Sequence, residues 1–133
     1  MADVFISCAS QDRSKVAPLL KALEDQGWSV FWDRVIPLKK SWRGVIESEL
    51  KIAKCVVVIW TENSTASRGV LAEVNKADEN NILIQVLFEN VDIPLPYDQQ
   101  QAANLTDWKS GSSHPEFTRL LIAISETIGI RLN

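Results

Sequence analysis

The stretch Cys55–Trp60, CVVVIW, decides the fold class of this chain. Six consecutive apolar residues, four of them β-branched, are typical of a parallel strand that is buried on both faces. A polar segment at 61–67 follows, then a helical pattern over 68–80 and a second apolar run at 82–88. Strand, helix and strand in this order predict a right-handed crossover between parallel neighbours.

The same alternation continues on both sides of this unit. Runs rich in β-branched and aromatic residues predict further strands at 4–6, 28–32 and 105–108. Apolar residues spaced by three and four positions predict helices between the strands, including one over 43–53. Five strands alternating with helices predict an α/β fold: a flavodoxin-like three-layer domain whose five-stranded parallel sheet has the order 2-1-3-4-5, with helices on both faces.

The final helix carries a clear start signal. Ser113 and Glu116 have the spacing of a capping box, and Pro115 lies in the expected first turn. His114 falls in the same segment, where we expect solvent-exposed capping to be its role. We treat 1–133 as a single domain. Its short ends are compatible with excision from a longer protein that carries a sensor domain on the C-terminal side.

Composition excludes several classes of protein. The 133 residues are 46% apolar and 23% charged, which is typical of a globular chain and not of a disordered tail. No run approaches the ~20 apolar residues of a membrane span. Asp3 interrupts any secretory signal. The 14 basic and 17 acidic residues give a net charge of −3, which argues against direct nucleic-acid binding.

The cysteine and histidine content narrows the chemistry further. Two cysteines, Cys8 and Cys55, are typical of reduced thiols in a cytoplasmic chain. We interpret both as buried, with the alternative that Cys8 is accessible from the predicted site. One histidine is too few for a zinc site with several His or Cys ligands, so we expect no metal. Carboxylates are the remaining candidates for chemistry.

A site in such a sheet is expected outside the carboxyl ends of the strands, at the switch point between the first and third strands. The segments that end there are 7–13, 33–42 and 61–67. They contain neither a G-x-G-x-x-G loop nor a Walker A lysine, so redox use of a bound dinucleotide is unsupported.

The segment 33–43, DRVIPLKKSWR, is basic in a chain that is acidic overall, and it includes Trp42. Such a loop beside a switch point suits an anionic ligand with a stackable ring, such as a dinucleotide. The alternative is a solvated loop whose lysines maintain solubility. Taken alone, the composition favours the second interpretation.

Glu73 is the candidate carboxylate of the helix over 68–80. At ~100° per residue it lies on the flank of an apolar face, partly buried near the switch point. A carboxylate there could stabilise positive charge on a ribose during N-glycosidic cleavage. Glu49 and Asp78 are rivals with similar helical placement. Structural ion pairs account for flanking acids more often than catalysis does.

Taken together, these segments resemble a Toll/interleukin receptor (TIR) domain of the bacterial type. The resemblance covers about 3–128 and rests on the order and spacing of several motifs. They are DVFISCASQDR (3–13), GWSVFWD (27–33), RVIPLKKSW (34–42), CVVVIWTENSTASRGVLAEV (55–74) and LTDWKSG (105–111).

The resemblance implies NAD+ cleavage or assembly with other TIR domains. In enzymatic members a glutamate contacts the nicotinamide ribose, and that glutamate maps to Glu73. NAD+ would be a substrate, with no resident cofactor. The implied substrate-binding residues are Ser7, Cys8, Asp33, Arg34, Trp42 and Gly69.

Two positions depart from the family pattern. Gly69 stands where the W-x-x-x-E motif has its tryptophan, and Cys8 stands where the first motif often has an aromatic residue. Each change removes ring surface that could stack on the substrate, worth about 1 kcal/mol per contact. Trp42 could carry more of the stacking.

Two functions follow from these expectations. The first is an NAD+ glycohydrolase that releases nicotinamide and forms ADP-ribose or a cyclic ADP-ribose product, activated by self-assembly in prokaryotic immunity. The alternative is a non-catalytic signalling adaptor that acts through homotypic TIR–TIR contacts. The expected contact is the family's BB loop, with Val35, Ile36, Pro37, Leu38, Lys39 and Lys40. A nucleoside-transferring enzyme of the same architecture shares the carboxylate chemistry but lacks the motif match.

Overall fold

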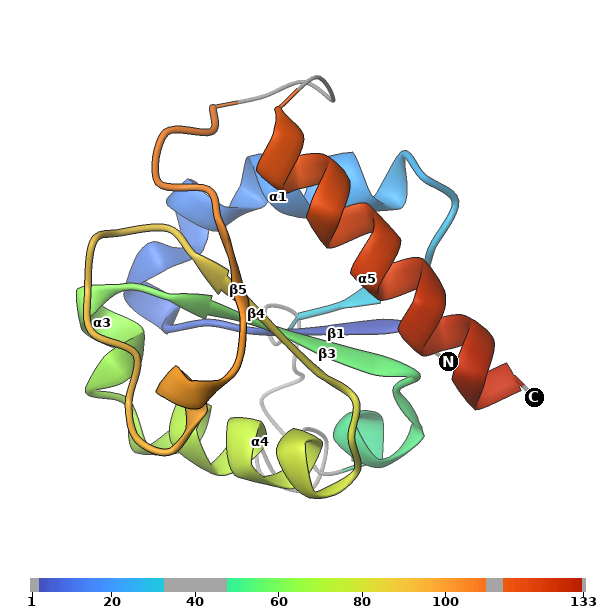
Figure 1. The fold of residues 1–133 in the computed structure, drawn as a ribbon, viewed down its shortest axis with the longest axis horizontal. Helices are drawn as coiled ribbons and strands as arrows, with labels where there is room; N and C mark the ends of the chain where they lie inside the picture. Colours follow the sequence, from blue (N-terminus) through green and yellow to red (C-terminus); the bar gives the residue numbers. More distant parts are fainter. Residues whose placement is uncertain (1–2, 33–47, 110–113, 133) are drawn as a thin grey trace, which may run out of the picture.

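The computed structural model describes residues 3–32, 48–109 and 114–132, with side chains up to 129. Its centre is one parallel sheet in the order β2-β1-β3-β4-β5 (Figure 1), as the sequence predicted. The strands are β1 (Val4–Ser7), β2 (Val30–Phe31), β3 (Cys55–Trp60), β4 (Leu83–Leu87) and β5 (Ala102–Asn104).

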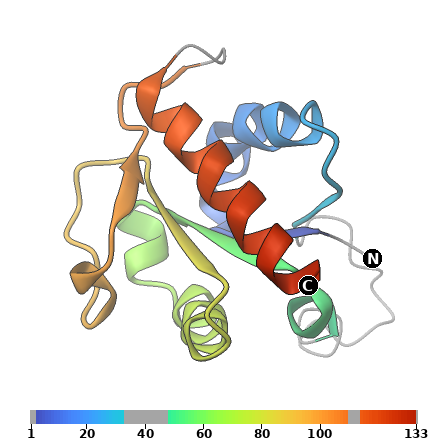
Figure 2. The same ribbon diagram turned by 45° about the vertical axis from the view of Figure 1, so that its right-hand side comes forward.

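Helices cover both faces of this sheet. Figures 1 and 2 place α1 and α5 together on one face and α4 on the other, with α3 at the edge where β3 ends. The bounds are α1 (Arg13–Glu24), α3 (Glu62–Thr65), α4 (Arg68–Glu79) and α5 (Pro115–Leu132), with 3-10 turns η1 (Ser10–Asp12) and η2 (Tyr97–Gln99). A helical segment at 48–52 lies within the helix predicted for 43–53.

The core divides into two sides because side chains alternate along each strand. One side is formed by Val4, Ile6 and Cys8 of the first strand and its exit, against Leu19, Leu23, Phe117 and Ile124 of α1 and α5. On the other side, Phe5 and Val56 pack with Ala77 of α4. Val58 and Trp60 pack with Val70 and Val74. All six residues of β3 are buried, as expected for a central parallel strand.

The fifth strand is not where the sequence predicted it. The prediction was 105–108, but β5 covers Ala102–Asn104. Leu105 and Trp108 form a turn closed by a 3.1 Å hydrogen bond from the Trp108 amide to the Leu105 carbonyl. Their spacing of three buries both side chains on one side, where Trp108 stacks on Phe117 with ring centroids 5.4 Å apart. That spacing indicates a turn and not the alternation of a strand.

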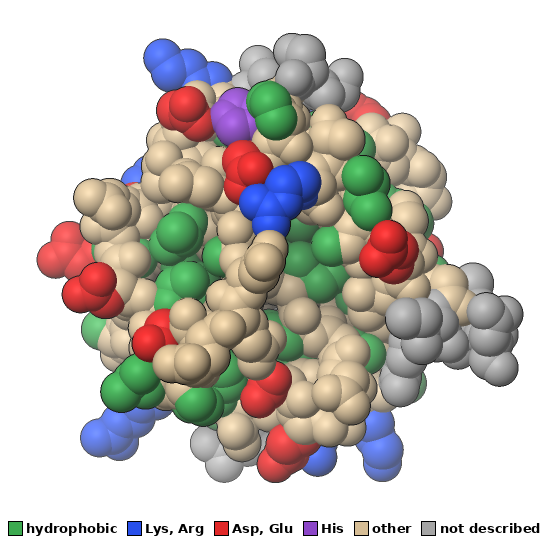
Figure 3. Space-filling model, viewed as in Figure 1, with side chains coloured by type: hydrophobic (Ala, Val, Ile, Leu, Met, Phe, Trp, Pro, Cys, Tyr) green, Lys and Arg blue, Asp and Glu red, His purple; other side chains and the backbone are tan. Residues whose placement is uncertain are grey.

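Charged side chains do not gather into one patch on the face seen in Figure 3, where acidic and basic residues are spread over the surface. Within 3–32, 48–109 and 114–132, the structure has no helix with the length and apolar character needed to cross a membrane.

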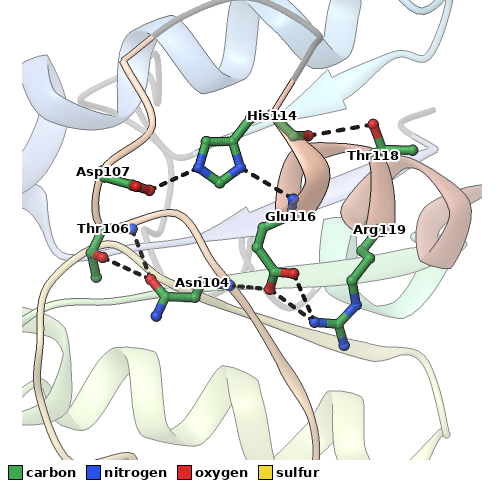
Figure 4. Close-up of polar contacts among 7 residues, drawn as sticks. All are labelled: Asn104, Thr106, Asp107, His114, Glu116, Thr118 and Arg119. Atoms are coloured by element: carbon green, nitrogen blue, oxygen red, sulfur yellow. Dashed lines mark hydrogen bonds and ion pairs between the residues drawn. The ribbon is translucent and has the colours of Figure 1, made fainter.

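The start of α5 is held by side chains, as Figure 4 shows. Ser113, half of the predicted capping box, lies outside the described residues. His114 caps the helix as predicted, because its Nδ1 accepts a 3.1 Å hydrogen bond from the Glu116 amide, but the side chain is only 22% exposed and not solvent-exposed as expected. Its Nε2 lies 2.7 Å from Asp107 Oδ1. The Glu116 carboxylate accepts from the Asn104 amide at 2.9 Å and pairs with Arg119.

Candidate functional site

Helix α4 positions Glu73. The helix begins after Ser67, whose hydroxyl accepts a 3.2 Å hydrogen bond from the Val70 amide and caps the first turn. Val70 and Val74 are buried against the sheet. Glu73 lies between them along the helix and is half-buried on the flank of the apolar face, as the helical pattern predicted.

Ser7 is one partner of this carboxylate. Its hydroxyl donates a 2.6 Å hydrogen bond to Glu73 Oε1, across 66 positions of sequence. Ser7 is the last residue of β1, is fully buried and pairs with Val58 of the neighbouring strand. The carboxyl end of β1 and helix α4 therefore meet at these two residues. The sequence predicted a site at these strand ends.

Cys8 does not share this face. It packs in the core beneath α1 and α5, because successive residues point to opposite sides of an extended chain. Only 7% of the residue is exposed, so the alternative of an accessible thiol is wrong. Burial and the nearby negative charge of Asp3 raise the pKa of the other thiol, Cys55, to about 12. Both cysteines are buried, and neither forms a disulfide with a described residue.

Gly69 lies one helical turn before Glu73 on the exposed side of α4. A Cβ atom built there would meet the Ser67 hydroxyl at 3.8 Å, which is ordinary van der Waals contact. The position therefore has room for a side chain, and the missing ring is not excluded by the backbone.

The rest of the predicted site falls on residues outside the described part of the chain. This group comprises the predicted substrate-binding residues Asp33, Arg34 and Trp42 and the predicted loop interface, Val35, Ile36, Pro37, Leu38, Lys39 and Lys40. Their roles stay predictions.

The two rival carboxylates lie elsewhere. Asp78, near the end of α4, accepts a 2.8 Å hydrogen bond from the Gln100 side-chain amide. Glu49 lies half-buried in the segment 48–52. Neither is among the residues that the structure brings to Ser7, so the arrangement favours Glu73 over both.

Sequence reasoning missed a buried carboxylate at the same edge of the sheet. Asp12 is 5% exposed and accepts hydrogen bonds from the Thr61 hydroxyl and, at 3.0 Å, from the Asn63 side chain. Thr61 also forms a reciprocal capping box with Ser64 at the start of α3. The sequence did contain a signal for this contact. Polar residues follow both β1 and β3, and these two strands are neighbours in the predicted strand order.

A third carboxylate, Glu89, lies just after β4 and contacts the first turns of α1 and α3. It pairs with Lys15 and accepts a 2.8 Å hydrogen bond from the Glu62 amide. The hydrogen bonds from Lys15 and from the Glu62 backbone lower the pKa of Glu89. Asp12 and Glu89 are thus both engaged in joining elements to one another.

Tryptophan side chains contribute to the core and to its margin. Trp60 is fully buried, and its indole N–H donates a 2.9 Å hydrogen bond to the Gln85 side chain. Trp28 and Trp32 pack at the margin of the core beneath α1 and α5. Among the residues with described positions, no group of three His, Cys, Asp or Glu side chains could hold a metal ion.

Comparison with known proteins agrees with this architecture. The TIR domain of the Toll-related receptor TRR-2 from Hydra magnipapillata is similar, with a TM-score of 0.79 and 18% identity over 92% of this chain and 96% of that one. The TIR domains of the activated Roq1 resistosome, which directly recognizes the pathogen effector XopQ, are also similar. Their TM-score is 0.68, with 19% identity over 93% of this chain and 99% of that one. At these identities the likeness shows the fold alone.

None of the curated proteins compared with the sequence matches it. The family model of the TIR domain, however, matches residues 4–121, which include every strand and the start of α5. A match of this extent, on a five-stranded sheet in the expected order, shows that the chain belongs to the TIR domain family.

Proposed function

We propose that this TIR domain is an NAD+ glycohydrolase that cleaves the bond between nicotinamide and ribose. The observation that carries the proposal is the Glu73 carboxylate, held by the Ser7 hydroxyl beside the carboxyl end of β1. Glu73 also occupies the position of the family's glutamate in the segment GVLAE, 69–73.

The chemistry requires a negative group at this place. As the nicotinamide nitrogen leaves with the bonding electrons, positive charge develops on the ribose, and a fixed carboxylate stabilises that charge. Attack of water at the same carbon gives ADP-ribose and releases one proton. Attack by a nucleophile within the same molecule gives a cyclic product. Trp42, Arg34 and Asp33 complete the proposed substrate contacts.

The decisive measurement is nicotinamide release from NAD+ by the purified chain, followed over a wide range of protein concentration. Glu73→Gln keeps the volume of the side chain and removes its charge, so we expect a loss of about 100-fold or more. Glu79→Gln makes the same chemical change at an exposed position of the same helix and serves as the matched control.

Two results would contradict the proposal. One is the absence of nicotinamide release at every concentration of a folded wild-type protein. The other is equal activity of Glu73→Gln and the wild type. Chromatography of the products separates ADP-ribose from a cyclic product, which the fold alone does not determine.

The second candidate is an adaptor that acts by homotypic assembly. It is favoured by the similarity to TIR domains that were solved within an activated resistosome. Sedimentation of the wild type and of Lys39→Glu/Lys40→Glu would test the predicted loop interface. Assembly without NAD+ cleavage would favour the adaptor, whereas specific activity that rises with concentration would favour assembly-coupled catalysis.

We place this function in the cytoplasm, in line with two buried cysteines that form no disulfide among the described residues, and in immune signalling, with a sensor domain as partner. Western analysis of cell fractions would test the location.

A further inference from the structure

Ser7 is an unusual residue for its position. The strand β1 reads VFIS, and the other three side chains are apolar and buried. On the face toward α4, Ser7 follows Phe5 and pairs with Val58, so packing alone would favour valine or isoleucine. A hydroxyl that is fully buried costs free energy unless it is hydrogen-bonded. The residue therefore needs a polar partner.

That partner is the Glu73 carboxylate, 2.6 Å away at Oε1. A serine hydroxyl carries a single proton to donate. Because Ser7 donates it to Glu73 and is 0% exposed, its side chain is turned to the carboxylate and not to solvent. This differs from the substrate-binding role that the family resemblance implies for the same residue.

We propose that Ser7 is a positioning residue, which fixes the orientation of the Glu73 carboxylate and acts on the reaction only through it. The inference rests on the proposed NAD+ cleavage. A glutamate has three rotatable bonds, whereas β1 is an interior strand of the sheet, paired on both sides with β2 and β3. A hydrogen bond from that strand holds Oε1 in place before substrate arrives, so the charge need not reorganise during the reaction.

A group that acts in this way affects the transition state more than the ground state. Removing the hydroxyl lets the carboxylate move away from the ribose while leaving the other substrate contacts intact. We therefore expect kcat to fall and KM to stay nearly constant. If Ser7 had only a structural role, its replacement would lower stability without changing the kcat of the folded protein.

Kinetics of four variants test this distinction. Ser7→Ala should lower kcat by about 10- to 100-fold. Ser7→Thr retains the hydroxyl and should recover most of the activity, while Ser7→Cys keeps the size with a weaker donor and should fall between them. The matched control is Thr127→Ala, which removes a half-buried hydroxyl whose hydrogen bond lies within its own helix, α5, on the opposite face of the sheet from α4. It should leave kcat unchanged.

A double-mutant cycle in thermal unfolding tests the Ser7–Glu73 contact independently of activity. Ser7→Ala should lower the Tm of the wild type. It should have no effect, or a stabilising one, in a Glu73→Ala background, where the hydroxyl has already lost its partner.

The combined outcomes separate the two proposals. Additive Tm changes would overturn the positioning role whatever the activity. A wild-type kcat in Ser7→Ala, or an equal loss of kcat in Thr127→Ala, would overturn it as well. A folded wild type that releases no nicotinamide would overturn the proposed NAD+ cleavage, and with it the catalytic part of the Ser7 assignment, while a coupled cycle would retain the contact itself. Loss of kcat, rescue by threonine and a coupled cycle together support both.

Discussion

Asp12 and Asn63 lie 51 positions apart, yet the Asn63 side-chain amide donates a 3.0 Å hydrogen bond to the Asp12 carboxylate. The Thr61 hydroxyl donates to the other oxygen of the same group. These contacts join the turn after β1 to the turn after β3, at the edge of the sheet where Glu73 lies. A single buried carboxylate thus holds two segments that border the candidate site.

Replacing Asp12 tests the strength of this connection. Asp12→Ala leaves the donors of Thr61 and Asn63 without their acceptor, so we expect a loss of about 1–3 kcal/mol in the free energy of unfolding. Urea denaturation measures it. Glu24→Ala, at an exposed acid of α1, is the control and should change stability by less than about 0.5 kcal/mol. Equal effects of the two changes would show that the Asp12 contacts contribute nothing specific.

The two glycines Gly69 and Gly27 should respond oppositely to alanine. Gly69 lies in the first turn of α4 with room for a Cβ, so Gly69→Ala should stabilise the protein by up to about 1 kcal/mol. Gly27 has φ +98°, a left-handed conformation that alanine rarely adopts, so Gly27→Ala should cost about 1 kcal/mol or more. Thermal unfolding of both variants provides the comparison. A stabilising Gly27→Ala would contradict the backbone argument.

Glu116 should contribute a pH-dependent part of the stability. The hydrogen bond from the Asn104 backbone, followed by that from Arg119, lowers the pKa of Glu116 below its ordinary value of 4.5. A lowered folded-state pKa stabilises the protein above pH 4.5, and the contribution disappears as the pH falls through the folded value.

The measurement is Tm against pH for the wild type and Glu116→Gln. The variant should unfold a few degrees lower at neutral pH, and the difference should close in the acid range. A difference that is constant with pH would assign the effect to packing and not to the charge.

Neither thiol should react while the protein is folded. Burial holds Cys55 protonated, with a pKa of about 12, and Cys8 lies in the core. We expect slow labelling by a thiol reagent in buffer and rapid labelling of both cysteines in denaturant. Cys8→Ser and Cys55→Ser identify which thiol is labelled. Fast reaction of Cys8 in the native protein would restore the idea that it opens to the site.

Much of the fold could be predicted because the pattern is carried by local sequence. The run of β3 is too apolar to be anything but a central strand, and the helix of α4 has both its cap, Ser67, and its stripe in the sequence. The fifth strand could not be placed in this way. Ala102–Asn104 has no hydrophobic signal of its own, and it becomes a strand because it pairs with β4 beneath α5.

The candidate site, like the fold, could be predicted from the sequence only in part. The helical face of Glu73 and its flanking position follow from periodicity along one element. Ser7 and Cys8 point to opposite faces of the sheet because side chains alternate along an extended chain. The family resemblance alone assigned both residues to the substrate site. The Asp12 contacts required two turns, distant in sequence, to be brought together.

The sequence by itself determined the family, the strand order and the position of Glu73 on the flank of its helix, because hydrophobic periodicity and motif spacing are properties of the chain. Only the tertiary structure decided which groups contact that glutamate and which are withdrawn from it. A hydrogen bond such as that from Ser7 to Glu73 joins residues 66 positions apart, and its partners are fixed by the packing of α4 against β1 and β3. Local sequence determines what each element is, whereas packing determines which side chains meet.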